Sequence, residues 1–150
     1  MRRIYRRREA RDRDAPSVPL PRSVDSLSGV EFEVLAVSLV LRGGFGTARV
    51  VGGPGDMRVD VIATTPGGRT VRFQCKQYRD PQRRVGAEVL HQLADRRLRS
   101  GIDEFVVVTN GSFSTPVRGF ADAHGIHSID GETFQRWWNG GETLDGILRR

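Results

Sequence analysis

Two short segments of this chain carry polar residues that buried strands do not require. Asp60 interrupts the apolar run 59–63, and Gln74 and Lys76 alternate with apolar residues in 71–76. Because residues two apart in a strand share a face, Gln74 and Lys76 point to the same side while the alternate apolar residues point to the core. The two segments therefore predict a polar site on one face of a pair of strands.

The residue types at this site suit the hydrolysis of a phosphodiester. That reaction needs a divalent cation to hold the phosphate and lower the pKa of a water molecule. Mg²⁺ (or Mn²⁺) prefers hard oxygen ligands, and Asp60 offers a carboxylate, Gln74 an amide oxygen and Cys75 a backbone carbonyl. Lys76 offers the positive group that orients the nucleophile and offsets developing charge.

Lys76 is the only lysine among the 24 Lys and Arg residues of the chain. An ammonium is a compact point charge whose pKa shifts readily, whereas a guanidinium is a planar fork that stays protonated. We interpret Lys76 as a position where arginine would not serve. The alternative is a chance lysine in an arginine-biased composition.

A helix is predicted to begin near Ser28, because Ser28 and Glu31 have the spacing of a capping box. Apolar residues then recur at helical spacing until 43–44, where two glycines end the helix. Glu33 lies on or beside the apolar stripe, and a carboxylate that faces a core needs a partner. Glu33 is therefore a candidate for the same site, and the alternative is a glutamate at the rim that reaches solvent.

The breaker-rich segment 66–69 predicts a hairpin between the two polar strands. Asp60 meets Gln74 and Lys76 if the register places all three on one face, and a slip of one residue turns Asp60 away. The sequence leaves this register open. Asp56 is a further carboxylate, but it lies in the glycine-rich loop before the first strand.

The remaining pattern predicts a three-layer α/β domain with a central mixed sheet, in the order α-β-β-β-α-β-α-β-α. We expect one domain over 23–140, an arginine-rich, disordered arm over 1–22 and a tail over 141–150. The other predicted elements are a strand at 45–51, a helix at 85–98, a doubly buried strand at 104–109, a helix at 116–124, a strand at 126–129 and a helix at 133–138.

The net charge of +6 and the pI of about 10.8 predict a polyanionic partner. The basic groups concentrate in 1–22 and 69–99. The first region either contacts phosphates or is a solvated leader. The absence of a long apolar run argues against a membrane span, and a single cysteine fits the reducing cytoplasm.

The segment 55–60, followed by Phe73-Gln74-Cys75-Lys76, resembles the Mrr-like restriction endonuclease domain. This is a branch of the PD-(D/E)xK nuclease superfamily in which glutamine replaces the second acidic residue. The resemblance covers roughly residues 25–138. It extends to the family's first helix, to the strand and loop after its central helix, and to its closing strand, at 29–33, 107–114 and 129–131.

The resemblance implies a three-layer α-β-α restriction-endonuclease-like fold and a metal-dependent DNA endonuclease of restriction or genome defence. It makes Asp60 the metal-binding aspartate, Gln74 the second ligand position and Lys76 the catalytic lysine. Glu33 becomes the helix carboxylate that supports the metal or the water. One departure is Arg58, which stands at the entry into the strand where the family usually has glycine.

Double-stranded DNA is the expected partner, and arginines around the site are the expected phosphate contacts. These are Arg58, Arg72, Arg79, Arg83 and Arg84. Two other functions remain open, namely a structure-specific repair or junction-resolving nuclease, which dimerisation would favour, and a non-catalytic DNA-binding module. Nothing in these residues decides whether the protein forms a homodimer or depends on methylation.

Overall fold

The computed structural model describes residues 3–6, 23–51, 58–80 and 82–149. Within them one sheet has the strand order β1-β2-β3-β4-β5-β6. The first four strands pair antiparallel, whereas β4, β5 and β6 run parallel, so the predicted mixed sheet is confirmed. The strands are β1 (Arg3–Arg6), β2 (Thr47–Val51), β3 (Arg58–Thr64), β4 (Thr70–Lys76), β5 (Glu104–Thr109) and β6 (Ile126–Ile129).

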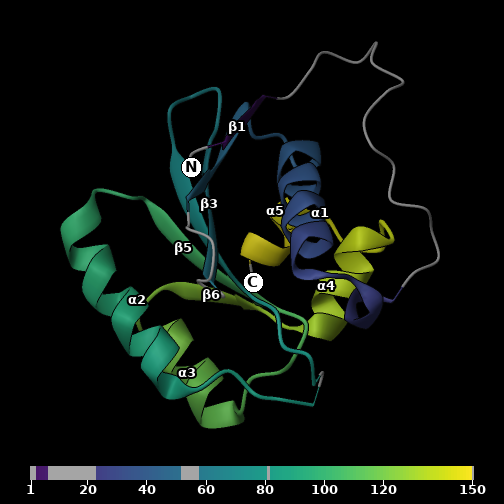
Figure 1. Ribbon diagram of the computed structural model, residues 1–150. Helices are drawn as coiled ribbons and strands as arrows, with labels where there is room; N and C mark the ends of the chain where they lie inside the picture. The colour runs from purple at the N-terminus through teal and green to yellow at the C-terminus, as the bar shows by residue number, and fades with distance from the viewer. Residues whose placement is uncertain (1–2, 7–22, 52–57, 81, 150) are drawn as a thin grey trace.

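Helices cover both faces of this sheet (Figure 1), which confirms the three-layer α/β/α architecture. Helices α1, α4 and α5 lie on one face, and α2 and α3 lie on the other. The bounds are α1 (Gly29–Arg42), α2 (Ala87–Ser100), α3 (Thr115–Ala123), α4 (Gly131–Trp138) and α5 (Leu144–Leu148), with a short 3-10 helix η1 (Val24–Ser26) before α1.

Helix α1 begins at the predicted capping box. The Ser28 hydroxyl accepts from the Glu31 amide at 3.1 Å, and the Glu31 carboxylate accepts from the Ser28 amide at 3.0 Å. At its other end the Arg42 guanidinium donates to the main-chain carbonyls of Trp137 and Trp138. The helix is therefore fixed at its start by its own sequence and at its end by α4.

Each face of the sheet has its own core. Phe32 of α1 stacks on Phe134 of α4, with ring centroids 4.9 Å apart, over the inner face of β3 and β4. On the opposite face Leu90 and Leu93 of α2 pack on Phe105 of β5. Strand β5 is buried on both faces, as its continuous apolar run predicted.

The structure differs from our predictions at both ends of the chain. We predicted no regular structure over 1–22, but Arg3–Arg6 pairs with β2 as an antiparallel strand. Ile4 and Tyr5 favour strands and strand pairing satisfies the main-chain groups, so this part of the arginine-rich arm can join a sheet edge. The other arm residues lie outside the described part of the chain.

The predicted tail 141–150 contains helix α5. Its Leu144 and Ile147 side chains are buried against the α1 core, and the Thr143 hydroxyl caps the helix by accepting from the Gly146 amide at 3.0 Å. Two buried apolar residues three apart are enough to dock one turn of helix. The domain therefore continues past residue 140.

Candidate active site

The β3–β4 hairpin settles the register that the sequence left open. Asp60 stands directly opposite Gln74, and Arg58 stands opposite Lys76. The turn closes through the Thr65 amide, which donates to the Arg69 carbonyl at 2.8 Å, and Gly68 takes the positive φ of +88° that favours glycine. The predicted hairpin is confirmed, and the register brings Asp60 onto the same face as Gln74 and Lys76.

Both central residues of this site are buried, with 7% of Asp60 and 2% of Gln74 exposed. Their neighbours Val61 and Phe73 face the α1 core, so the polar pair faces the side of the sheet that carries α2 and α3. A buried carboxylate and a buried amide on adjacent strands need polar partners.

Arg72 supplies one of those partners. Its guanidinium Nη2 forms an ion pair with Asp60 Oδ2, with 17% and 10% of the two side chains exposed. Arg72 is opposite Ile62, so it reaches Asp60 diagonally across the two strands. We predicted Arg72 as a phosphate contact. Its guanidinium contacts the candidate metal-binding carboxylate, and phosphate binding by Arg72 remains a prediction.

The ion pair leaves one atom of each residue without a partner. Asp60 Oδ1 and Arg72 Nε are both buried, and neither has a hydrogen bond within the described residues. Leaving a buried charged group partly unsatisfied costs ~1–3 kcal/mol or more. A cation on Oδ1 would remove that penalty, so the donor set of Asp60 and Gln74 fits a hard metal ion.

Cys75 lies between Gln74 and Lys76 on the opposite face of β4, and its thiol is buried in the α1 core. Burial first, and then the charges of Asp60 and Glu33, raise the pKa of Cys75 far above its usual range. A buried thiol with a raised pKa is a poor nucleophile. Ligation through its carbonyl, as predicted, remains a prediction.

Glu33 approaches the site from the other layer. It is half-buried on α1, and together with Asp60 it acts on the Cys75 thiol. Both carboxylates thus lie within electrostatic range of one side chain, although they come from opposite faces of β4. Within the described part of the chain, no three His, Cys, Asp or Glu side chains are grouped closely enough to hold a metal ion together.

The side chain of Asn110, a residue that the sequence placed only in a loop, holds the end of β4. The buried Asn110 side chain accepts from the Tyr78 amide and donates to the Tyr78 carbonyl, both at 2.7 Å. Asn110 directly follows Thr109, the β5 partner of Lys76. Its amide therefore extends the parallel pairing of β4 and β5 beyond Lys76. The sequence feature that could have indicated this contact is the pair Asn110-Gly111 directly after a buried strand.

Two glycines hold the same end of the sheet. A Cβ on Gly111 would lie 2.2 Å from the Arg83 carbonyl oxygen, and one on Gly131 would lie 2.2 Å from the Asn110 carbonyl oxygen. The Gly131 amide also donates to the Gly111 carbonyl at 2.9 Å. The loops after β4, β5 and β6 are therefore packed main chain against main chain.

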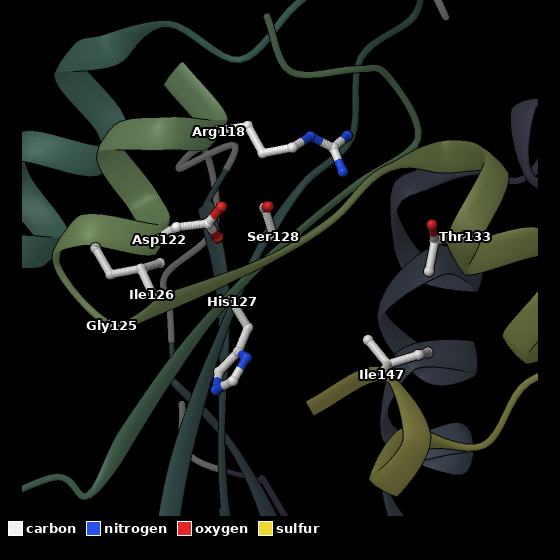
Figure 2. Close-up of a pocket in the computed structure, with 8 residues that line it drawn as sticks. All are labelled: Arg118, Asp122, Gly125, Ile126, His127, Ser128, Thr133 and Ile147. Carbon is white, nitrogen blue, oxygen red and sulfur yellow. The ribbon is translucent and has the colours of Figure 1, made fainter. Parts of the chain in front are cut away.

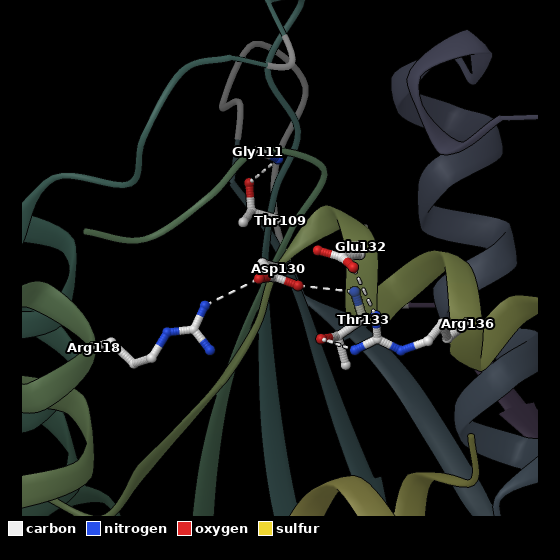
Figure 3. Close-up of polar contacts among 7 residues, drawn as sticks. All are labelled: Thr109, Gly111, Arg118, Asp130, Glu132, Thr133 and Arg136. Carbon is white, nitrogen blue, oxygen red and sulfur yellow. Dashed lines mark hydrogen bonds and ion pairs between the residues drawn. The ribbon is translucent and has the colours of Figure 1, made fainter. Parts of the chain in front are cut away.

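Asp130 joins this arrangement at the start of α4, as Figure 3 shows. Its carboxylate accepts from the Thr133 amide at 2.8 Å and from the Arg118 guanidinium at 3.0 Å. Partial burial raises the pKa of Asp130, but the bonds from Thr133 and Arg118 outweigh it and hold that pKa below its usual range. Asp130 is a helix cap with an ion pair, which the sequence did not reveal.

The other predicted phosphate contacts lie on the connection after β4. Arg79, Arg83 and Arg84 are exposed there, and the Arg83 guanidinium lies over the Tyr78 ring at 4.8 Å. The side chain of Arg58 and all of Asp56 lie outside the described part of the structure. Phosphate binding by these arginines remains a prediction.

A separate cavity of about 400 Å³ runs along β6, between α3 on one side and α4 and α5 on the other (Figure 2). None of the predicted site residues lines it. Its lining residues include Arg118, Asp122, His127, Ser128, Thr133 and Ile147. The candidate site at Asp60 and Gln74 is thus distinct from this cavity.

The fold and the site define a class, an α/β/α domain with a carboxylate–glutamine pair followed by lysine on its central hairpin. Residues 24–138 match a family model described as a restriction endonuclease, of the Mrr catalytic-domain type. The chain therefore belongs to the restriction endonuclease family. A search of curated proteins found no match.

Two solved structures are similar to this chain. The structure of EndoMS in apo form is 17% identical, has a TM-score of 0.41, and covers 54% of this chain and 35% of its own. The MspJI restriction endonuclease in complex with a 27-mer oligonucleotide is 23% identical, has a TM-score of 0.45, and covers 78% of this chain and 30% of its own. The chain thus spans about a third of the length of either structure.

None of the helices in the described part of the chain is long and apolar enough to cross a membrane.

Proposed function

We propose that this protein is a Mg²⁺-dependent (or Mn²⁺-dependent) endonuclease that hydrolyses phosphodiester bonds of double-stranded DNA in cytoplasmic restriction or genome defence. One observation carries the proposal. The buried Asp60 carboxylate has an oxygen without a partner in the described part of the chain and stands directly opposite Gln74, in a member of the restriction endonuclease family. A buried orphan carboxylate oxygen beside an amide is a costly arrangement that a bound cation would relieve.

The residues of the site divide the work of hydrolysis. Asp60 would hold the cation through Oδ1 and Gln74 through its amide oxygen, with the Cys75 carbonyl and Glu33 as further oxygen ligands. When bound, the cation supplies a water of lowered pKa and a positive centre for the phosphate. The Lys76 ammonium would orient that water and offset the negative charge that develops on the phosphate.

The exposed arginines after β4 would bind the DNA backbone beside the cut. Arg79, Arg83 and Arg84 follow Lys76 within eight positions along the chain and are exposed. Arginine forks match phosphate oxygens, and such contacts place the duplex without reading its sequence. Cleavage should therefore weaken steeply as salt rises.

The proposal is tested with purified protein, supercoiled plasmid and Mg²⁺, with and without EDTA. Nicking should require the metal and should be lost in Asp60→Asn, which keeps the shape of the side chain but removes its charge. Asp122→Asn, an exposed aspartate on α3, is the matched control and should cleave like wild type.

The same assay separates the rival functions. Cleavage confined to branched DNA would replace restriction by repair or junction resolution. If no metal-dependent nicking occurs on methylated, unmethylated or branched DNA, while binding persists, the protein is a non-catalytic DNA-binding module.

A further inference from the structure

The ion pair between Asp60 and Arg72 is an end-on contact rather than a bidentate one. A bidentate arginine–carboxylate pair uses two donors and both carboxylate oxygens. Here Nη2 and Oδ2 are joined, and Oδ1 and Nε are both buried without a hydrogen-bond partner among the residues that the structure describes. Arg72 therefore binds one carboxylate oxygen of Asp60, and the other oxygen can take a further partner.

This geometry leaves Asp60 held but still able to take a cation. Arg72 holds one carboxylate oxygen and thereby restrains the side chain of Asp60, and with it the direction in which Oδ1 points. The Arg72 guanidinium also brings a positive charge beside Asp60, whose cross-strand neighbour Gln74 is neutral. A divalent cation that binds Oδ1 therefore meets a carboxylate whose charge is already balanced.

We propose that Arg72 is a positioning residue that aims Asp60 Oδ1 at the metal while lowering the affinity of the site for a bare divalent cation. The inference rests on the proposed function, since it takes Asp60 as the metal ligand. The cation then binds firmly only when a second anion, such as a backbone phosphate of DNA, adds negative charge beside it.

The described carboxylates are consistent with such a weak site. Within the described residues no three Asp, Glu, His or Cys side chains are grouped closely enough to hold a metal ion, and of the proposed ligands only Asp60 and Glu33 carry a charge. Affinity for a hard cation rises with the number of charged oxygen ligands. The positive charge of Arg72 offsets part of the negative charge that Asp60 contributes to the site.

The test measures Mn²⁺ binding without DNA by electron paramagnetic resonance, in wild type and three variants. Arg72→Gln keeps an N–H donor for Asp60 but loses the charge, and it should bind Mn²⁺ on the order of tenfold more tightly, the size expected when a unit charge leaves the neighbourhood of a divalent cation. Arg72→Lys keeps the charge and should stay near the wild-type affinity. Asp60→Asn should lose the binding.

Each outcome has a distinct meaning. Equal or weaker Mn²⁺ binding by Arg72→Gln overturns the inference, because Arg72 would then only hold the fold. Unchanged binding by Asp60→Asn would instead remove Asp60 from the metal site and sink the proposed function itself.

Arg72→Gln leaves a buried carboxylate with less support, so its folding is followed by thermal unfolding with and without Mn²⁺. The cation should raise the midpoint more in Arg72→Gln than in wild type, since a ligand that binds the native state more tightly stabilises it more. Nitrogen-15 spectra of the wild-type arginine side chains give a readout that needs no variant to fold. The Arg72 guanidinium should stay immobilised at saturating Mg²⁺, and its release would refute the positioning role.

Discussion

Asn110→Ala should destabilise the fold and loosen the end of β4. The native Asn110 side chain is buried and makes two hydrogen bonds of 2.7 Å, one to the Tyr78 amide and one to the Tyr78 carbonyl. Alanine removes both partners at once. The Tyr78 main chain then has a buried donor and a buried acceptor whose bonds are lost.

The expected cost follows from these two bonds. Each buried group left unsatisfied costs ~1–3 kcal/mol, with part of that recovered if water enters. The sum is about 2–4 kcal/mol, a large share of the ~5–15 kcal/mol that separates folded from unfolded domains. Since Tyr78 lies two residues after Lys76, DNA cleavage should fall by more than the folded fraction alone explains.

The assay is urea unfolding of wild type and Asn110→Ala, followed by fluorescence of the buried Trp137 and Trp138. Asn139→Ala is the matched control, because Asn139 is exposed and accepts only a 3.3 Å bond from Gln135. The control should change the free energy of unfolding by less than ~0.5 kcal/mol. If Asn110→Ala changes the free energy of unfolding as little as the control does, Asn110 does not hold the β4–β5 junction and our account of that junction is wrong.

Three further predictions test other parts of the site. Gly131→Ala should lower the unfolding midpoint strongly, because its Cβ would lie 2.2 Å from a main-chain oxygen, whereas Gly119→Ala, with open space around it, should be neutral or stabilising by differential scanning fluorimetry. Lys76→Arg keeps the charge but should lose plasmid cleavage, and wild-type activity in that variant would refute the argument from the single lysine. The lowered pKa of Asp130 means that its contribution to stability is full above its unfolded pKa of ~3.9 and is lost as pH falls through the lower folded value. Asp130→Asn should therefore flatten the acid side of the stability–pH curve, and an unchanged curve would contradict the role of Thr133 and Arg118.

The sequence predicted the elements whose signals are local. The capping box at Ser28, the glycines at the end of α1 and the continuous apolar run of β5 each depend on neighbours a few residues away, and the structure has all three. Helix α5 was not predicted because its three apolar residues, Leu144, Ile147 and Leu148, span little more than one turn, which is too short for a clear periodic pattern. They become a helix only when the α1 core is there to receive them.

The pairing of Arg72 with Asp60 could not be predicted in the same way. The alternation in β4 placed Arg72 on the polar face correctly, but its partner depends on the register with β3 and on which way a long side chain leans. A diagonal contact across two strands is a property of the assembled sheet, not of either segment. The family resemblance assigned Asp60 the role of metal ligand, but it did not indicate which residue would position the Asp60 side chain.

The register itself explains why site and core are determined together. Val61 and Phe73 are opposite one another on the α1 face and are at most 1% exposed. Their burial therefore fixes the register of β3 and β4. A slip of one residue would turn Asp60 into the α1 core and Val61 toward the polar face, which costs both a buried unpaired charge and lost apolar burial. The apolar residues of the hairpin therefore place Asp60 opposite Gln74 as firmly as they hold the fold, and a substitution such as Val61→Asp should abolish the site through the register before it affects any ligand.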